Sequence, residues 1–155
     1  MNTALRIRAL AVLALGLALP AMATAEVRAS GGWARATVPG AKTAAGYLTF
    51  TNSGDGERRL LKIVSPVSDE VTLHRTSIDE KGMTRMWPMA VLAVQPGESL
   101  RLEPGGIHVM LGALKTALVA GQKVPLTIKF DGGEPEFTVL LEVVPLTATE
   151  GPARR

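Results

Sequence analysis

The residues best suited to chemistry are gathered in one stretch of the chain, from position 74 to position 110. This stretch contains both histidines of the 155-residue sequence and four of its six methionines. The order is His74, eleven residues, Met86, twenty-one residues, and then His108-Val109-Met110. Imidazole nitrogens and thioether sulfurs are neutral, soft to borderline ligands, which suit Cu(I) better than zinc, calcium or magnesium. The stretch therefore predicts a copper site.

Which methionine binds the metal together with the histidines depends on how the chain folds around position 86. Side chains alternate between the two faces of a β-strand, so His108 and Met110 are expected to point to the same face. In a strand through Met86, the side chains of Met83 and Met89 point the opposite way, and we expect these two to be packing residues. If this segment is a loop, the alternation is lost and Met83 becomes the substitute ligand.

Other interpretations of these residues are weaker. A methionine is most often a filler of an apolar core, and a lone histidine on a strand is usually structural. Here, however, the chain after residue 25 holds neither residue type outside the stretch. The sequence contains no cysteine, which excludes the thiolate ligand of a blue-copper site and the usual donors of structural zinc. Since the metal pattern uses both histidines, no nucleophile and base stand out, and we expect no enzyme.

The elements that must position these residues are β-strands. Short apolar or alternating runs are separated by Gly, Pro, Asn and Asp, without a long stretch of helical periodicity, which is typical of an all-β protein. The predicted strands cover residues 33–36, 46–52, 59–64, 71–74, 84–87, 92–94, 99–103, 107–111, 123–130 and 136–144. We find one domain, residues 26–146, followed by a flexible tail at 147–155 that is small, polar and charged.

The first 25 residues have the pattern of a secretory signal. Two arginines precede an apolar run at 9–19, and Ala23-Thr24-Ala25 provides the small residues of a cleavage site. We expect cleavage after Ala25 and a soluble periplasmic protein without a membrane span. Loss of the two leader arginines lowers the formal charge from +3 to +1, which gives no reason to expect nucleic-acid binding. Without a cysteine, no lipid-modified cysteine follows the cleavage point.

The ligand spacing resembles that of the periplasmic PCu(A)C copper chaperone family. The resemblance extends over nearly all of the mature chain. Its landmarks are Trp33-Ala-Arg-Ala-Thr-Val-Pro, Ala45-Gly-Tyr-Leu-Thr-Phe-Thr-Asn, Val71-Thr-Leu-His, Met86-x-Pro88 and Pro104-Gly-Gly-x-His-x-Met. It implies a cupredoxin-like Greek-key β-sandwich in which His74, Met86, His108 and Met110 bind one Cu(I). It also implies delivery to copper-site assembly in cytochrome c oxidase, alongside a thiol-bearing copper chaperone.

The chain departs from this family at two places. The residue after the first histidine can be methionine in the family and is Arg75 here, so it supplies no further sulfur. Some members carry a C-terminal tail rich in histidine and methionine that takes Cu(II), whereas residues 147–155 contain neither. Two alternative functions remain at this stage. One is a periplasmic copper buffer or resistance protein without a dedicated recipient, and the other is a structural module in which the His/Met cluster is incidental.

Overall fold

The computed structural model describes residues 26–152, which form ten β-strands with no helix among them. The strands are β1 (Val27–Arg35), β2 (Ala44–Asn52), β3 (Arg58–Val64), β4 (Ser68–Ile78), β5 (Thr84–Met89), β6 (Ala93–Val94), β7 (Ser99–Leu102), β8 (Ile107–Leu114), β9 (Lys123–Phe130) and β10 (Phe137–Val144). The all-β prediction is confirmed, and each predicted strand has a counterpart. Within the described range, no helix could cross a membrane. The predicted leader, residues 1–25, lies outside the described residues.

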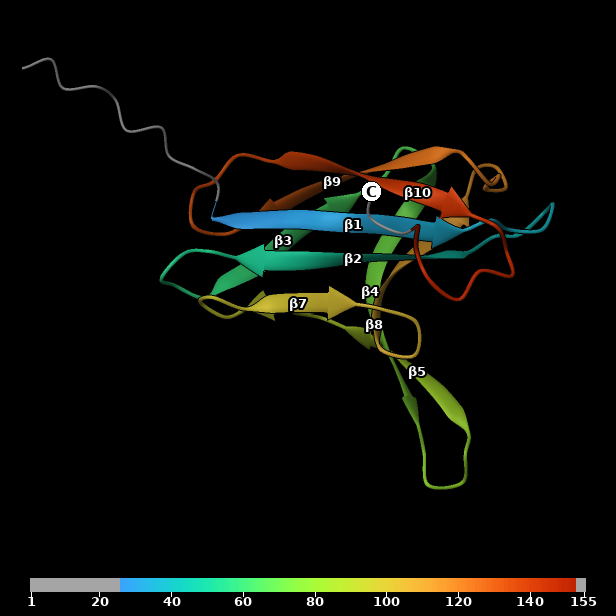
Figure 1. Cartoon of the computed structure of the whole chain (residues 1–155), viewed down its shortest axis with the longest axis horizontal. Helices are drawn as coiled ribbons and strands as arrows, with labels where there is room; N and C mark the ends of the chain where they lie inside the picture. Colours follow the sequence, from blue (N-terminus) through green and yellow to red (C-terminus); the bar gives the residue numbers. More distant parts are fainter. Residues whose placement is uncertain (1–25, 153–155) are drawn as a thin grey trace, which may run out of the picture.

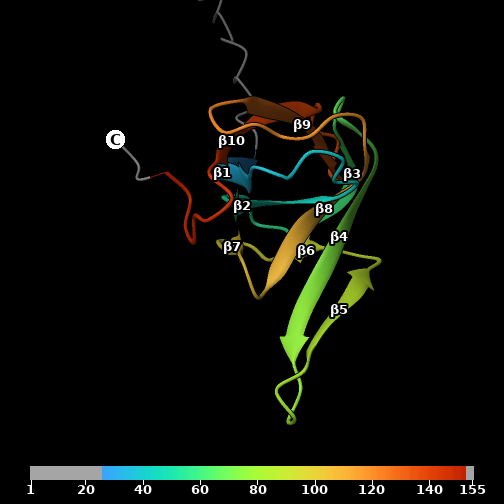
Figure 2. The ribbon, with the colours of Figure 1, turned by 90° about the vertical axis from the view of Figure 1, so that its right-hand side faces the viewer.

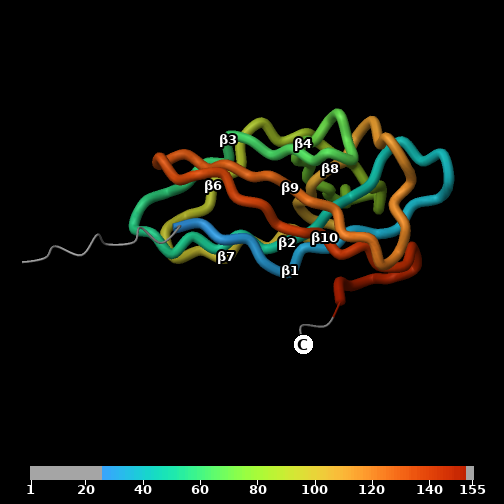
Figure 3. Tube along the Cα trace, turned by 90° about the horizontal axis from the view of Figure 1, so that it is seen from above, coloured from blue at the N-terminus to red at the C-terminus, as the bar shows by residue number. Residues whose placement is uncertain are grey.

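The strands form one continuous sheet that folds back on itself. Hydrogen bonds join them in the order β5-β4-β8-β2-β1-β10-β9-β3-β6, and β7 also pairs with β2. Strands β1 and β10 pair in parallel, and the other strand pairs of the described chain are antiparallel. Figure 3 shows β3, β4 and β8 on one side of the molecule and β1, β2 and β7 on the other. The resulting sandwich encloses the core.

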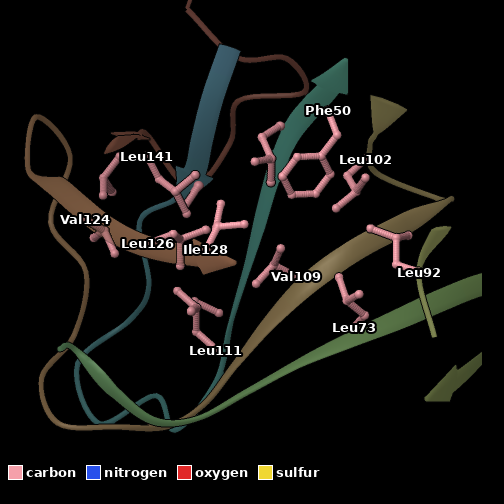
Figure 4. Close-up of a cluster of buried hydrophobic side chains, with 14 of the residues drawn as sticks. Phe50, Leu73, Leu92, Leu102, Val109, Leu111, Val124, Leu126, Ile128 and Leu141 are labelled. Atoms are coloured by element: carbon pink, nitrogen blue, oxygen red, sulfur yellow. The ribbon is translucent and has the colours of Figure 1, made fainter. Parts of the chain in front are cut away.

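The core follows from the two-residue alternation of the strands. In β9, Val124, Leu126, Ile128 and Phe130 are buried while the residues between them are partly exposed. They meet side chains from both layers, including Phe50, Leu73, Val109 and Leu141 (Figure 4). The rings of Phe50 and Phe130 meet edge to face, with centroids 5.2 Å apart. Each large aliphatic side chain buried in this way contributes about 1.5–3 kcal/mol.

The first strand begins at Val27, well before the predicted start at residue 33. The glycine pair at 31–32 looks like a break in the sequence, yet the structure uses it as a β-bulge, and the pairing register with β2 shifts between Ser30 and Trp33. Gly31 has a φ of 62°, and a Cβ atom on Gly32 would lie 2.8 Å from the carbonyl oxygen of Leu140 on β10. The two glycines therefore let β1 bend and approach β10 closely.

The strand that carries His74 is also longer than predicted, and this creates a protruding hairpin. The prediction ended the strand at residue 74, whereas β4 continues to Ile78, because residues 73–78 pair with β5. Figures 1 and 2 show the end of β4 and the first part of β5 extending beyond the body of the sandwich. Met86, one of the candidate ligands, lies on this hairpin.

A buried asparagine fixes the far end of β2. The side chain of Asn52 has no exposed surface and makes three hydrogen bonds. Its amide nitrogen donates to the carbonyl oxygens of Gly56 at 2.8 Å and Val94 at 3.0 Å, and its oxygen accepts from the backbone N–H of Gly54 at 3.0 Å. This one residue satisfies the buried carbonyl oxygen of Val94 on β6 and partly buried backbone groups of the β2–β3 turn.

We predict that Asn52→Ala lowers the free energy of unfolding by about 1–3 kcal/mol, because it leaves the buried carbonyl group of Val94 without a partner and removes two partly buried hydrogen bonds. Urea unfolding of the purified protein measures the change. Ser53→Ala is the matched control, since the Ser53 hydroxyl makes one exposed hydrogen bond, to the carbonyl oxygen of Glu26 at 3.0 Å. Similar losses in the two variants would contradict the structural role assigned to Asn52.

Candidate metal centre

The register of three neighbouring strands brings the four predicted ligands to one face of the sheet. His74 on β4 lies directly opposite His108 on β8, and Met110 lies opposite Thr72. On the other side of β4, Met86 lies opposite Thr76. Cross-strand partners point to the same face, and so do residues two apart on one strand. His74, Met86, His108 and Met110 therefore share a face, although thirty-four positions separate the first from the third.

The two histidine rings lie close together. Their centroids are 6.0 Å apart, and the ring planes are inclined by 39°. The backbone N–H of Thr76 donates to the carbonyl oxygen of Gly106 at 3.0 Å, so the backbone groups of every second residue of β4 face β8. By the same alternation, Thr76 and Met86 form a pair without mutual backbone hydrogen bonds, the type in which side chains approach most closely. This places Met86 diagonally across from His74.

Hydrogen bonding leaves each ring with one nitrogen suited to an ion. His108 is 4% exposed, and its Nδ1 lies 3.2 Å from the carbonyl oxygen of Gly106. A carbonyl only accepts, so Nδ1 donates and Nε2 keeps its lone pair. The Nε2 atom of His74 lies 3.0 Å from the hydroxyl oxygen of Thr72, whereas its Nδ1 is buried without a hydrogen-bond partner. When Nε2 donates its N–H to the Thr72 hydroxyl, Nδ1 carries the lone pair that a bound ion would satisfy, so the residues present fit a metal.

The four methionines of the stretch divide as strand alternation requires, with one exception. Met110 is half-buried beside Ala45 of β2, and Met86 is 47% exposed. Met89 pairs with Leu73 on the opposite face and packs against the core, as expected. The expectation that Met83 is a packing residue is wrong: it lies in the hairpin turn, before β5 begins, and is 58% exposed. Because residues 84–89 form a strand, the alternation that selects Met86 holds.

The turn of the hairpin is held by one carboxylate. Asp79 accepts hydrogen bonds from the backbone N–H of Met83 at 2.9 Å and of Lys81 at 3.0 Å, and its other oxygen accepts from Arg85 at 3.2 Å. These bonds, the one from Met83 foremost, lower the pKa of Asp79 below its ordinary value of 3.8. The carboxylate is therefore charged near neutral pH and fixes the turn that leads into β5.

Two aromatic residues beside the histidines were not found by sequence reasoning. The ring of Tyr47 on β2 has its centroid 6.4 Å from that of His108 and 4.4 Å from that of Trp33 on β1. The Arg35 guanidinium lies 5.9 Å from the centroid of the Trp33 ring. Burial raises the pKa of Tyr47, and Arg35 partly offsets this. Tyr47 shares a face with Ala45, but only the structure shows that Ala45 is the cross-strand partner of Met110, so spacing along the chain did not place Tyr47 at the site.

The site is an open face of the sheet with neutral donors. A hollow of about 370 Å³ lies between β3 and β4, and none of the four candidate ligands lines it. In the part of the chain that the structure describes, no three His, Cys, Asp or Glu side chains come close enough to share a metal ion. Arg75 pairs with Trp87 on the face opposite His74. The available set is therefore two imidazoles and two thioethers, which favours Cu(I) over harder ions.

Comparisons with known proteins agree with this architecture. Residues 27–142 match the family described as "Putative lipoprotein LpqE-like". The "Putative lipoprotein Lxx21020" of Leifsonia xyli subsp. xyli (strain CTCB07) is 32% identical over 107 residues, which cover 69% of this chain and 63% of that protein. The chain thus spans under two thirds of the length of this relative.

Solved structures share the fold. The apo PmoF2 PCuAC domain is 22% identical, with a TM-score of 0.67 over 81% of this chain and 95% of that domain. The solution structure of CuI-DR1885 from Deinococcus radiodurans is 30% identical, with a TM-score of 0.54 over 74% of this chain and 75% of that one. The predicted cupredoxin-like β-sandwich is therefore confirmed.

We predict that Met86→Leu weakens Cu(I) binding at least about tenfold, which corresponds to 1.4 kcal/mol. The substitution removes the sulfur and conserves the volume, and the side chain is half exposed, so the fold is retained. A competition titration with a Cu(I) chelator measures the affinity. Met83→Leu, an exposed methionine on the same hairpin, is the control and keeps the original affinity. An unchanged affinity in Met86→Leu would remove this residue from the site.

Proposed function

Because this chain belongs to the LpqE-like family and to the PCu(A)C copper chaperones whose fold it shares, we propose that it binds one Cu(I) and delivers it to another protein. The ligands are His74, Met86, His108 and Met110. The observation that carries the proposal is the pairing of His74 with His108 on the face that also holds both methionines. No other described face combines these donor types, since the described chain has no further histidine.

The donor chemistry supports Cu(I) as the cargo. Two imidazoles and two thioethers add no charge, so the bound ion keeps its single positive charge. Cu(II) prefers nitrogen and oxygen ligands, and in the described chain no carboxylate lies close enough to both histidines to share an ion with them. Thioethers also do not form disulfides, which suits an oxidising compartment. The protein therefore acts by binding and releasing an ion, and not as an enzyme.

The position of Met86 supports delivery by ligand exchange. Strand β5 is at one end of the sheet order, on the protruding hairpin (Figure 2). In β5, the residues between Thr84, Met86 and Pro88 use their backbone groups for hydrogen bonds to β4. The backbone groups of Thr84, Met86 and Pro88 therefore face away from β4. A partner can thus approach Met86 from the open edge. Its ligands can replace the exposed thioether first, while the more buried histidines still hold the ion.

The place of action follows from the leader pattern and the family. We propose that residues 1–25 direct export and that the protein works in the periplasm, with residues 26–146 as the copper-binding domain. The tail predicted at 147–155 starts in contact with this domain, since Nε of Arg35 donates to the carbonyl oxygen of Ala148 at 2.7 Å, and its last three residues lie outside the described residues. By the resemblance to the PCu(A)C family, the recipient is copper-site assembly in cytochrome c oxidase. Either an oxidase subunit or a thiol-bearing copper chaperone accepts the ion there.

We predict that the purified protein binds one equivalent of Cu(I), and that X-ray absorption of the bound ion reports both nitrogen and sulfur neighbours. The imidazoles supply the nitrogens and the methionines supply the sulfurs. Zn²⁺ is the control ion and is expected to bind far more weakly, since the site offers no thiolate or carboxylate. Failure to bind Cu(I), or a first shell without sulfur, would favour an incidental cluster in a structural module.

A genetic experiment separates delivery from buffering. We predict that deleting the gene lowers cytochrome c oxidase activity at limiting copper, and that added copper restores it, because the recipient can then load without a chaperone. Oxidase activity in membranes and growth at high copper are measured together. Loss of copper tolerance with normal oxidase activity would instead indicate a copper buffer without a dedicated recipient.

A further inference from the structure

Glu26 is bound on three sides by other parts of the chain. Its backbone nitrogen donates to Oε1 of Glu134 at 2.5 Å, and its carboxylate forms an ion pair with Arg58. Its carbonyl oxygen accepts from the backbone N–H of Ser53 at 2.7 Å and from the Ser53 hydroxyl at 3.0 Å. These contacts join the start of β1 to the turn after β2, to the start of β3 and to the loop before β10. They fix the position of the Glu26 nitrogen.

The carboxylate that receives this nitrogen is only partly satisfied. Oε2 of Glu134 is buried and has no hydrogen-bond partner, and neither has Nε of Arg58. A backbone amide has one N–H, so it can donate fully to only one of the two oxygens of Glu134. A buried carboxylate oxygen without a donor is costly, and native structures rarely leave one.

The leader pattern predicts cleavage between Ala25 and Glu26, and from this geometry we infer that Glu134 binds the amino group released there. A signal peptidase hydrolyses the Ala25–Glu26 peptide bond. Water supplies the hydroxyl that completes the carboxyl group of Ala25, and the nitrogen of Glu26 becomes a primary amine that takes up a proton. The sequence Ala23-Thr24-Ala25 has the small residues that such an enzyme requires at the first and third positions before the cut.

The ammonium group of a chain that begins at Glu26 has more N–H donors than the backbone amide, and it is positively charged. It has three N–H donors, so it serves both oxygens of Glu134, and it places a positive charge against that carboxylate. Charge-assisted hydrogen bonds of this kind are about twice as strong as neutral ones. Processing therefore stabilises the folded domain. The contact between Glu26 and Glu134 lies at the start of β1, away from the hairpin that carries Met86 (Figure 1). We therefore expect it to be independent of metal binding.

The first test locates the cut. The full-length chain is expressed with export, and the N-terminus and intact mass of the secreted protein are determined. We expect the mature protein to begin at Glu26. A mature protein that begins at any other residue would overturn the assignment.

The second test measures the effect of the amino group on stability. All ten described strands lie within residues 26–152, so a chain of residues 26–155 contains the folded unit. It is compared with residues 25–155, in which the added alanine turns the Glu26 amine back into an amide. We expect the chain beginning at Glu26 to melt about 2–6 °C higher, a shift typical of one strong hydrogen-bonded charge pair in a domain of this size. Equal melting temperatures would overturn the proposal.

A pair of variants assigns the effect to Glu134. In Glu134→Gln, the difference in melting temperature between the two chains is expected to shrink to under half, because the carboxylate that selects the ammonium is gone. Glu136→Gln is the matched control: this carboxylate lies two residues away and pairs with Lys62 at 2.9 Å. It should leave the difference between the chains intact. An undiminished difference in Glu134→Gln would show that another group binds the amine.

Discussion

The pairing of β4 with β8 on one side and β5 on the other is the constraint on which the rest of the structure depends. It places His74 opposite His108 and Met86 opposite Thr76. A slip of one residue in either ladder would move the affected ligand to the other face, since side chains alternate with a period of two. The core side of the same strands prevents such a slip, because Leu73 and Val109 are buried there and pair directly. The hydrophobic core thus fixes the candidate ligands indirectly, through register.

Because one face of β4 and β8 packs in the core and the other carries the candidate ligands, the candidate site needs no cavity. Each of β4 and β8 presents an apolar side chain inward and a ligand outward at the next position, as Leu73 and His74 do. Core and site are therefore separated by the thickness of one strand. The aromatic pair Trp33 and Tyr47 covers the outer face next to His108, and a smaller apolar cluster with Val144 forms there. The histidine side of the site is therefore packed against aromatic side chains, whereas Met86 is exposed to solvent.

The sequence predicted the fold class, the number of strands and the shared face of His108 and Met110, because all three follow from local alternation and turn residues. It did not predict that β1 runs through Gly31 and Gly32, since a glycine pair reads as a break unless the neighbouring strand is known. Nor did it predict the length of β4, because Arg75 to Ile78 have no apolar alternation and are strand only through pairing with β5. The contacts of Tyr47 with His108 and of Glu26 with Glu134 join distant segments, so spacing along the chain could not reveal them.

The unequal burial of the donors has a consequence for how an ion would be held and released. His108 is nearly inaccessible and held by the Gly106 carbonyl, so its loss from a bound ion requires strand movement. Met86 is half exposed on an edge strand whose turn is fixed by surface hydrogen bonds to Asp79. Displacing a thioether at the exposed end disturbs none of the core, whereas displacing an imidazole does. In the proposed ligand exchange, the methionine at the edge would therefore leave first, and the histidines in the middle of the sheet would leave last.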